Sequence, residues 1–409
     1  MCLFRVSRFV TTCCAGSVLG LLLVTVAPAE AQSTREEEHA RKQAEKAAVV
    51  APYKKNAAEK TIDRLEDWGL LTGTPKGVYP WFGSVYPSGG LAGGAGFRQG
   101  FRDTGAISGM AGWSVRAFKL GEVNLHLPEA ANRSIVIDIT GRWLDAPQIR
   151  YFGYGNDSRR SDRTSYGLTM LSGGINARLK PARWFHLGGG VEHLDVDTGS
   201  GVGRDPTIET IFTEGSAPGL GTDPKYFRSR AFLLIDWRKQ PGYRGRGGLY
   251  RVEATDYSAQ SGGRVSFRQL EAEIVQLIPF VAANWVIALR GLATTTDTER
   301  GNIVPFYFAP SIGGGTTVRG YPDFRFRGNH RIVVNAEYRW TAARFLDMAI
   351  FYDAGKVTDN RRDLDLDGVK TSVGIGARFH GAQGTVMRWE VARSREHAYR
   401  FIWSFGAAF

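Results

Sequence analysis

The sequence reads GGGTTVRGYPDFRFRGN at residues 313–329, NAEYRW at 335–340 and IFYDAGKV at 350–357. The first stretch is rich in glycine, is interrupted by proline and lies between two strand-like runs. It contains Arg319, and the next two strand-like runs each contribute one acid, Glu337 and Asp353. A lone arginine in a loop is common. An arginine loop followed by carboxylates on two successive strands is not, and it predicts that the three side chains meet.

From residue 77 onward, apolar and polar residues alternate with the period of two that β-strands show. The clearest case is 332–340, where one face is apolar or aromatic and the other carries Asn335, Glu337 and Arg339. A soluble sandwich would turn its apolar face inward, whereas a membrane barrel turns that face to lipid and its polar face to the lumen. Aromatic residues at strand ends and the number of long runs favour the membrane barrel.

Fifteen strand-like runs can be counted, near 91–98, 106–118, 134–144, 165–179, 184–196, 226–238, 247–258, 265–278, 285–296, 305–313, 330–340, 347–357, 370–379, 385–394 and 400–409. A further segment near 148–154 or 119–127 would make sixteen, and single-chain bacterial barrels have even strand numbers. Most runs reach the roughly 9–11 residues that a tilted strand needs to cross a bilayer. We therefore expect an all-β fold over 77–409, a transmembrane antiparallel β-barrel of 16 strands.

The first 31 residues have the features of a secretory signal peptide. Arg5 and Arg8 precede an apolar core at Val18–Val26, and Ala29–Ala31 fits a cleavage site. The three cysteines all lie in this segment, so a chain cleaved after it has no disulfides and no cysteine-ligated metal.

Residues 32–76 are rich in Ala, Glu, Lys and Arg, and we expect a periplasmic arm that is helical or disordered. The arm is either solvated or a helix that enters the lumen or lies on the membrane face. The formal net charge is +12, with the basic residues spread along the chain rather than gathered in one block. This spread argues against nucleic-acid binding and favours the lipid of the outer membrane as a partner.

The last strand-like run places Phe401, Trp403, Phe405, Ala407 and Phe409 on one face, and the sequence ends on Phe409. It resembles the C-terminal signal by which bacterial outer-membrane barrels are delivered to their assembly machinery. That machinery is thus an expected partner, and the bacterial outer membrane is the expected location.

Val318-Arg319-Gly320-Tyr321, the run Phe351–Gly355 (FYDAG) and the five strand-like runs after the arginine resemble the BamA/TamA superfamily, also called the bacterial surface antigen family. The segment YFGYGNDS at 151–158 also resembles one that recurs in such barrels. The resemblance covers residues 77–409. It implies a sixteen-stranded barrel whose sixth extracellular loop folds back into the lumen with the arginine at its tip. It also implies a role in outer-membrane biogenesis, through insertion or translocation of protein or lipid.

The alternation places Glu337 and Asp353 in the lumen phase of their strands. A guanidinium with five donors can bridge two carboxylates, which a lysine cannot match. Gly320 would let the loop backbone approach closely, and Tyr321 would pack while offering a hydroxyl. Our hypothesis is that Arg319 locks the loop to the strands that carry both acids. The alternative is a solvated loop arginine.

The stretch LAGGAGF at 91–97 reads as the first strand, with Gly93, Gly94 and Gly96. It would have to pair with the terminal strand that ends at Phe409. Glycine gives such a strand little side-chain packing and a high entropic cost of ordering. A weak closing seam would suit a lateral gate, although the glycines could equally ease a tight barrel corner.

Relatives that assemble or translocate proteins usually carry periplasmic POTRA domains before the barrel. Residues 32–90 precede the first expected strand, and no POTRA domain fits that segment. Two alternative functions therefore remain: a passive channel or transport pore, and a structural barrel that serves a periplasmic protein partner.

No motif indicates catalysis, a cofactor or a metal. The sequence DLDLDG at 363–368 opens like a calcium loop, but Gly374 stands where a ligating glutamate would be, so a polar extracellular loop is expected. His186 and His193 fall on opposite faces of one strand. Neither a G-x-S-x-G nor an H-E-x-x-H motif occurs, and no enzymatic activity is expected.

Overall fold

The computed structural model describes residues 75–239, 245–280, 284–343, 345–381 and 384–409. The expected signal peptide at 1–31 lies outside these residues, as does the expected arm at 32–76 apart from its last two residues. The described residues form one sheet of 16 antiparallel strands and a second sheet of two short strands. The prediction of an all-β, 16-stranded antiparallel barrel is confirmed.

Each strand of the large sheet pairs with the next one along the chain, and β11 pairs with β14. The large sheet comprises β1 (Gly77–Gly83), β2 (Ala92–Phe101), β3 (Gly105–Ser114), β4 (Lys119–His126), β5 (Ile135–Tyr151), β6 (Thr164–Ala182), β7 (Phe185–Ser200), β8 (Lys225–Asp236), β9 (Gly247–Ala259), β10 (Phe267–Phe280), β11 (Trp285–Asp297), β14 (His330–Ala343), β15 (Leu346–Thr358), β16 (Lys370–Gly381), β17 (Gly384–Ser394) and β18 (Arg400–Phe405). The small sheet joins β12 (Ser311–Ile312) to β13 (Phe326–Arg327). The described helices are short 3₁₀ turns, and none is long or apolar enough to cross a membrane.

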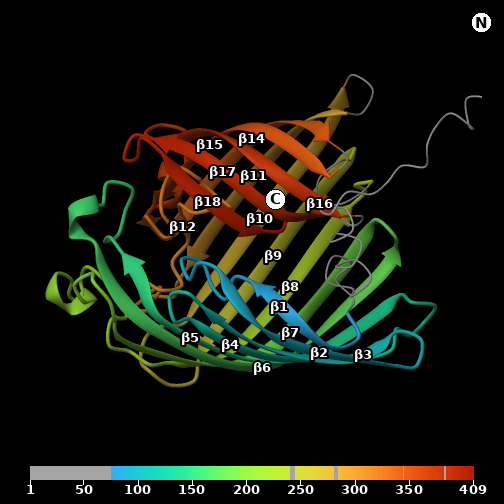
Figure 1. Cartoon of the computed structure of the whole chain (residues 1–409). Helices are drawn as coiled ribbons and strands as arrows, with labels where there is room; N and C mark the ends of the chain where they lie inside the picture. The colour runs from blue at the N-terminus through green and yellow to red at the C-terminus, as the bar shows by residue number, and fades with distance from the viewer. Residues whose placement is uncertain (1–74, 240–244, 281–283, 344, 382–383) are drawn as a thin grey trace, which may run out of the picture. The chain divides into compact units, whose positions relative to one another are not determined.

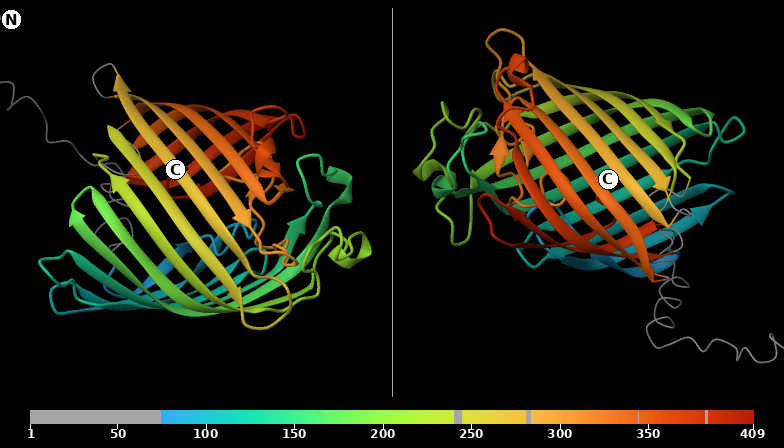
Figure 2. Two further views of the ribbon diagram at one scale, coloured as in Figure 1. Left: turned by 180° about the vertical axis from the view of Figure 1, so that it is seen from behind. Right: turned by 90° about the horizontal axis from the view of Figure 1, so that it is seen from above.

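The large sheet curls into a nearly closed barrel, with β1 in blue and β18 in red at its two ends (Figure 1). From behind, the strands run as one continuous wall (Figure 2). One end of the barrel carries the long connections 152–163, 201–224 and 298–329, and we call it the loop end. The opposite end carries short connections such as 102–104 and 183–184, and we call it the turn end.

Strand β14 shows which face of the sheet points inward. The side chains of Asn335, Glu337 and Arg339 are each 2% exposed, whereas the neighbouring Val334 is 39% exposed. On β15, Ile350 is likewise 53% exposed. Polar residues therefore face the interior and apolar residues face outward, which is the arrangement of a membrane barrel.

The first strand differs from the prediction. It is β1, and the glycine-rich stretch with Gly93, Gly94 and Gly96 forms β2, so these glycines do not lie at the seam. A Cβ at Gly96 would lie 2.3 Å from the ring of Tyr79 on β1, so this glycine makes room for an aromatic neighbour. Pro80 obscured β1 in the sequence, but proline is tolerated on a strand with a free edge.

The expected strand at 305–313 is also wrong. This segment belongs to the connection from β11 to β14, and only Ser311–Ile312 within it forms a strand. Its aromatic residues pack into a buried cluster instead of extending the sheet, and Phe306 is 0% exposed. The candidate at 119–127 is a strand, β4, and together with β1 it brings the count to sixteen.

The C-terminal strand is shorter than expected. It ends at Phe405, and Gly406 then turns the chain with a φ of +76°. The ring of Phe409 lies 4.9 Å from the Arg339 guanidinium and packs against inward side chains of β10 and β11. Phe405 and Phe409 therefore do not share one outward face, because the glycine redirects the last residues into the barrel.

Aromatic side chains pack together at the loop end. Tyr151, Tyr166, Tyr226 and Phe306 are each at most 1% exposed, and their rings meet edge to face with neighbours from the long connections. This cluster joins the starts and ends of β5–β10 to the connection that follows β11. It therefore anchors that connection on the side of the barrel opposite the predicted acids.

Candidate functional site

The predicted arginine lies in a compact turn, residues 313–321, which we call the arginine loop. Gly313 and Gly314 have φ values of +112° and +90°, which favour glycine. The Gly314 N–H donates to the carbonyl of Tyr321 at 2.9 Å, and the Thr317 hydroxyl donates to the carbonyl of Gly313 at 2.8 Å. These bonds close the turn and present Arg319 at its tip.

The interior wall opposite the arginine loop consists of inward side chains from β14, β15, β16 and β17. The strand register arranges them in three successive rows: Asn335, Asp353, Ser372 and Ser394; then Glu337, Phe351, Gly374 and Ala392; then Arg339, Ala349, Gly376 and Glu390. Ala349 and Gly376 at the centre of the last row are small and leave space over the wall. The charged side chains of Arg339 and Glu390 at the ends of that row can therefore reach toward its centre.

Arg319 occupies that space and is 1% exposed. Its Nε and Nη2 donate to the two carboxylate oxygens of Asp353 at 2.9 and 2.6 Å. Its Nη1 donates to Glu337 Oε1 at 2.5 Å and to Glu390 Oε1 at 2.9 Å. The guanidinium also lies 3.5 Å from the centre of the Phe351 ring. The structure thus brings Arg319, Glu337 and Asp353 together, and it adds Glu390.

Three more arginines complete the charged cluster. Arg339 donates to Glu337 Oε2 at 2.6 Å, and Arg378 contacts Glu337 and Glu390 at 2.7 and 2.9 Å. Arg388 donates to Glu390 Oε2 at 2.9 Å. Together with Arg319, four guanidiniums face three carboxylates among the described residues here. This surplus of positive charge keeps every carboxylate of the cluster paired.

The charge of the loop arginine follows from this environment. Burial lowers the pKa of Arg319, but the carboxylates of Glu337 and Asp353 outweigh burial and raise the pKa above its ordinary value. Neutral groups complete the shell around Asp353: Asn335 Nδ2 donates at 2.8 Å and the Ser372 hydroxyl at 3.1 Å. The loop arginine therefore stays charged and has a defined position.

The other motif residues let the arginine loop approach the wall. A Cβ at Gly320 would lie 2.6 Å from Ser372 Cβ, and one at Gly355 would lie 2.9 Å from a methyl of Val318. Val318 and Tyr321 are 0% and 1% exposed and belong to one apolar cluster beneath the loop. The predicted motif residues thus lie in one contact, whereas Phe405 and the glycines of β2 have no part in it.

Two further loop arginines were missed in the sequence. Arg325 donates from Nε and Nη2 to the carboxylate of Glu396, each at 2.7 Å, and Nη2 also donates to the carbonyl of Ser158 at 2.8 Å. Arg327 donates to the Tyr166 hydroxyl at 3.0 Å. Both are 1% exposed. The alternating FRFR at 324–327 is the signal that could have identified them.

The arrangement joins a loop to a barrel wall and offers no reactive group. Within the residues that the structure describes, no group of three or more His, Cys, Asp or Glu side chains could hold a metal ion. The contacts are ion pairs, hydrogen bonds and one cation–π contact, all buried. These contacts hold the arginine loop against the barrel wall.

Part of the chain matches a known family, and the fold is similar to those of solved structures. Residues 240–409 match the model of the Omp85 superfamily domain. The structure is similar to BamA from Haemophilus ducreyi lacking POTRA domains 1–3, with a TM-score of 0.54, 17% identity, and coverage of 80% of this chain and 69% of that chain. It is also similar to CdiB from Escherichia coli, with a TM-score of 0.56, 14% identity, and coverage of 81% and 62%. A comparison with curated proteins gave no match. At these identities the structural similarity shows the fold alone.

Proposed function

We propose that this barrel, whose residues 240–409 match the model of the Omp85 superfamily domain, acts in outer-membrane biogenesis by inserting or translocating protein or lipid. A barrel of this kind lies within the membrane into which protein or lipid would be inserted. Support for the proposal comes from the seam, the arginine loop and the filling of the loop end.

The seam between β1 and β18 is the observation that carries the proposal. Within the described residues β1 pairs with β2 and β18 pairs with β17, and each strand keeps one free edge. These end strands have seven and six residues, against 19 in β6. Unpaired backbone groups are costly in lipid, and a free edge is a template for another strand. A seam of this kind favours the entry of a client segment.

The two sides of the seam differ in how firmly they are held. On the β18 side, Arg400 donates to the carbonyl of Arg319 at 2.8 Å and the buried charge cluster joins β14, β15 and β17. On the β1 side, the neighbouring β2 is rich in glycine. We infer that the β1 side moves while the β18 side stays fixed.

A passive channel receives less support. The arginine loop lies against the interior wall, where Arg388 and Arg290 also contact its backbone. Aromatic side chains pack at the loop end on the opposite side. Both features narrow the path through the barrel.

The experiment is a reversible closure of the seam. Cysteines replace Val78 on β1 and Trp403 on β18, and reducible bifunctional crosslinkers of graded length join them in purified protein. The sequence beyond residue 31 contains no cysteine, so labelling is specific. In vesicles, we expect the crosslink to stop insertion of an unfolded barrel protein or transfer of a labelled lipid between leaflets. Reduction should restore the activity.

The matched control joins strands that are already paired. Phe97 on β2 and Gly109 on β3 are register partners, so a cysteine pair there should leave activity intact. Activity that persists with the seam closed would contradict the proposal. Large, steady conductance that is insensitive to the seam crosslink would instead favour the passive channel.

A further inference from the structure

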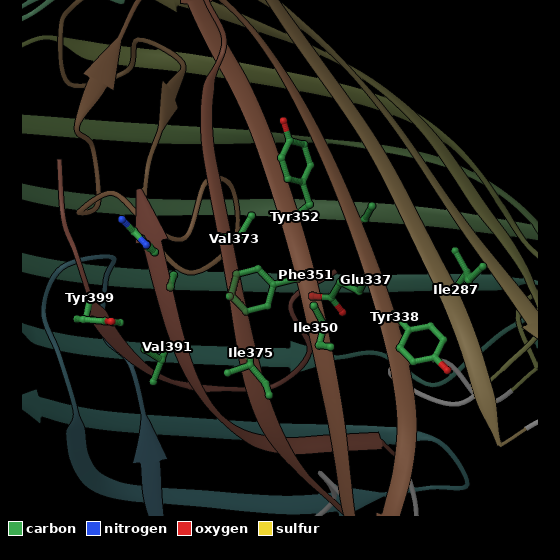
Figure 3. Close-up of a pocket in the computed structure, with 14 residues that line it drawn as sticks. Ile287, Glu337, Tyr338, Ile350, Phe351, Tyr352, Val373, Ile375, Val391 and Tyr399 are labelled. Atoms are coloured by element: carbon green, nitrogen blue, oxygen red, sulfur yellow. The ribbon is translucent and has the colours of Figure 1, made fainter. Parts of the chain in front are cut away.

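The outer surface of β14–β17 carries a shallow apolar groove of about 800 Å³. Two successive rows of outward side chains line it: Tyr338, Ile350, Ile375 and Val391; then Ala336, Tyr352, Val373 and Arg393. Figure 3 shows Ile350, Ile375 and Val391 on adjacent strands, with Tyr399 beyond Val391. Because outward side chains of such a barrel face lipid, the groove opens toward acyl chains.

A charged residue ends the second row. Arg393 is exposed and is the penultimate residue of β17, near the loop end. Other outward basic side chains have carboxylate partners, among them Lys119 with Asp145 at 3.0 Å, Arg268 with Asp256 at 2.9 Å and Lys356 with Asp365 at 2.5 Å. Within the described part of the chain, no carboxylate pairs with Arg393.

An outward guanidinium near the end of a barrel strand attracts anionic lipid headgroups, so an anion is expected beside it. Phosphate suits a guanidinium best, because two oxygens can accept parallel hydrogen bonds. Tyr352 lies in the same outward row as Arg393 and is 47% exposed, and Tyr399 in the connection after β17 is 74% exposed. Exposed tyrosines on a barrel surface present an apolar ring to lipid and a hydroxyl to the headgroup region.

We propose that this surface is a binding site for an anionic lipid that bears a phosphate group. One acyl chain lies in the groove over Ile375 and Val391, and the headgroup phosphate contacts Arg393. In outer-membrane barrels the long connections are extracellular, which assigns the loop end to the outer leaflet. The site lies on the outer face of the wall whose inner face holds Arg319. It does not depend on the proposed role in insertion.

The test uses the full-length protein, purified in neutral detergent and titrated with phosphatidylglycerol or phosphatidylcholine, with bound lipid counted by native mass spectrometry. We expect the wild-type protein to prefer phosphatidylglycerol. Arg393→Gln should weaken phosphatidylglycerol binding roughly fivefold and remove the preference, since one basic residue at a membrane surface contributes about that much. Val373→Trp, which fills the groove, should weaken binding of both lipids.

The matched control is Arg268→Gln, which removes an outward arginine that already has a carboxylate partner, and it should keep the preference. Equal loss in both arginine variants would overturn the proposal, because it would indicate a general surface charge effect. So would unchanged binding in Val373→Trp, or displacement of the lipid by inorganic phosphate alone. Heat-modifiability on gels verifies that each variant is folded.

Discussion

Arg319 is the residue whose side chain ties one loop to three strands at once. Its partners Glu337, Asp353 and Glu390 lie on β14, β15 and β17. Desolvation of buried charges is expensive, and the attraction offsets it only when geometry and hydrogen bonding are complete. Here every guanidinium nitrogen has a carboxylate partner. The main effect of the cluster is therefore to fix the arginine loop in one position, and its net contribution to the free energy of unfolding is small.

Removing Arg319 should destabilise the barrel because its carboxylate partners would lose a buried positive charge. In Arg319→Ala, Asp353 would keep only neutral donors, and an uncompensated buried charge costs about 3–5 kcal/mol. Adding Asp353→Asn to Arg319→Ala should recover part of that loss. The measurement is the urea midpoint in detergent, read by heat-modifiability. If the double variant is less stable than Arg319→Ala alone, the charge at Asp353 is not the cause.

Gly320 tests how closely the loop backbone must approach. A Cβ there would lie 2.6 and 2.7 Å from the Cβ atoms of Ser372 and Ser394. Overpacking of this kind costs roughly 1–3 kcal/mol, so Gly320→Ala should lower the urea midpoint accordingly. Gly173→Ala on β6 is the control, because nothing lies within 4 Å of its Cβ position. Equal midpoints for the two variants would show that the loop relaxes freely.

The acids of the site differed in how visible they were in the sequence. Alternation along two adjacent strands was enough to place Glu337 and Asp353 inward. Glu390 lies on β17, two strands beyond β15, and it reaches the site because Gly376 leaves its path open; a Cβ there would lie 2.7 Å from Glu390 Cγ. This contact depends on the register of the strands and on the absence of a side chain at Gly376. The alternation of polar and apolar residues predicts neither.

At the scale of elements, three consecutive loop residues span the seam at the loop end. Asp323 pairs with Arg400 of β18 at 3.5 Å, Phe324 stacks on Tyr86 of the β1–β2 connection at 5.8 Å, and Arg325 pairs with Glu396. Phe324 also has a φ of +60°, which is rare for a phenylalanine. We call residues 323–325 the clip. It holds the two end strands near each other although they share no ladder among the described residues.

Loss of the clip should loosen the end strands. Phe324→Ala removes the ring contact with Tyr86, and we expect a loss of about 2 kcal/mol, below the roughly 3–5 kcal/mol of a fully buried phenylalanine. Backbone amides of β1 and β18 should then exchange hydrogen for deuterium more than tenfold faster. Phe308→Ala, in the same connection but packed on Tyr226, is the control and should leave that exchange unchanged.

The strands that were predicted wrongly contain residues whose local pattern fits two different structures. Pro80 reads as a break, yet it lies in β1, where the free edge needs no amide from it. The run at 305–313 reads as a strand, yet its aromatic side chains pack inside the loop end. The alternating residues after Phe405 read as a longer strand, yet Gly406 turns them inward. A local sequence pattern shows only its periodicity. Whether such a segment joins the sheet or packs inside the barrel depends on its tertiary contacts.

At the scale of the molecule, the filled interior predicts poor ion conduction. The arginine loop and the aromatic cluster occupy opposite sides of the loop end. In planar bilayers we expect brief, small openings for the wild-type barrel and larger, longer ones for Arg319→Ala, because the released loop unblocks the lumen. Gly173→Ala should behave as wild type. Equal, steady conductance of all three proteins would mean that the loop does not obstruct the path.

The partners of Arg319 also impose an order in time. They follow it in the chain by 18, 34 and 71 residues. The arginine loop can therefore dock fully only after β14, β15 and β17 lie together in one sheet. Contacts this distant in sequence form late, since a long segment must be closed to reach them. Docking of the arginine loop is thus a late step of barrel folding, and a chain that stops short of Glu390 leaves this loop without its last carboxylate partner and open to proteolysis.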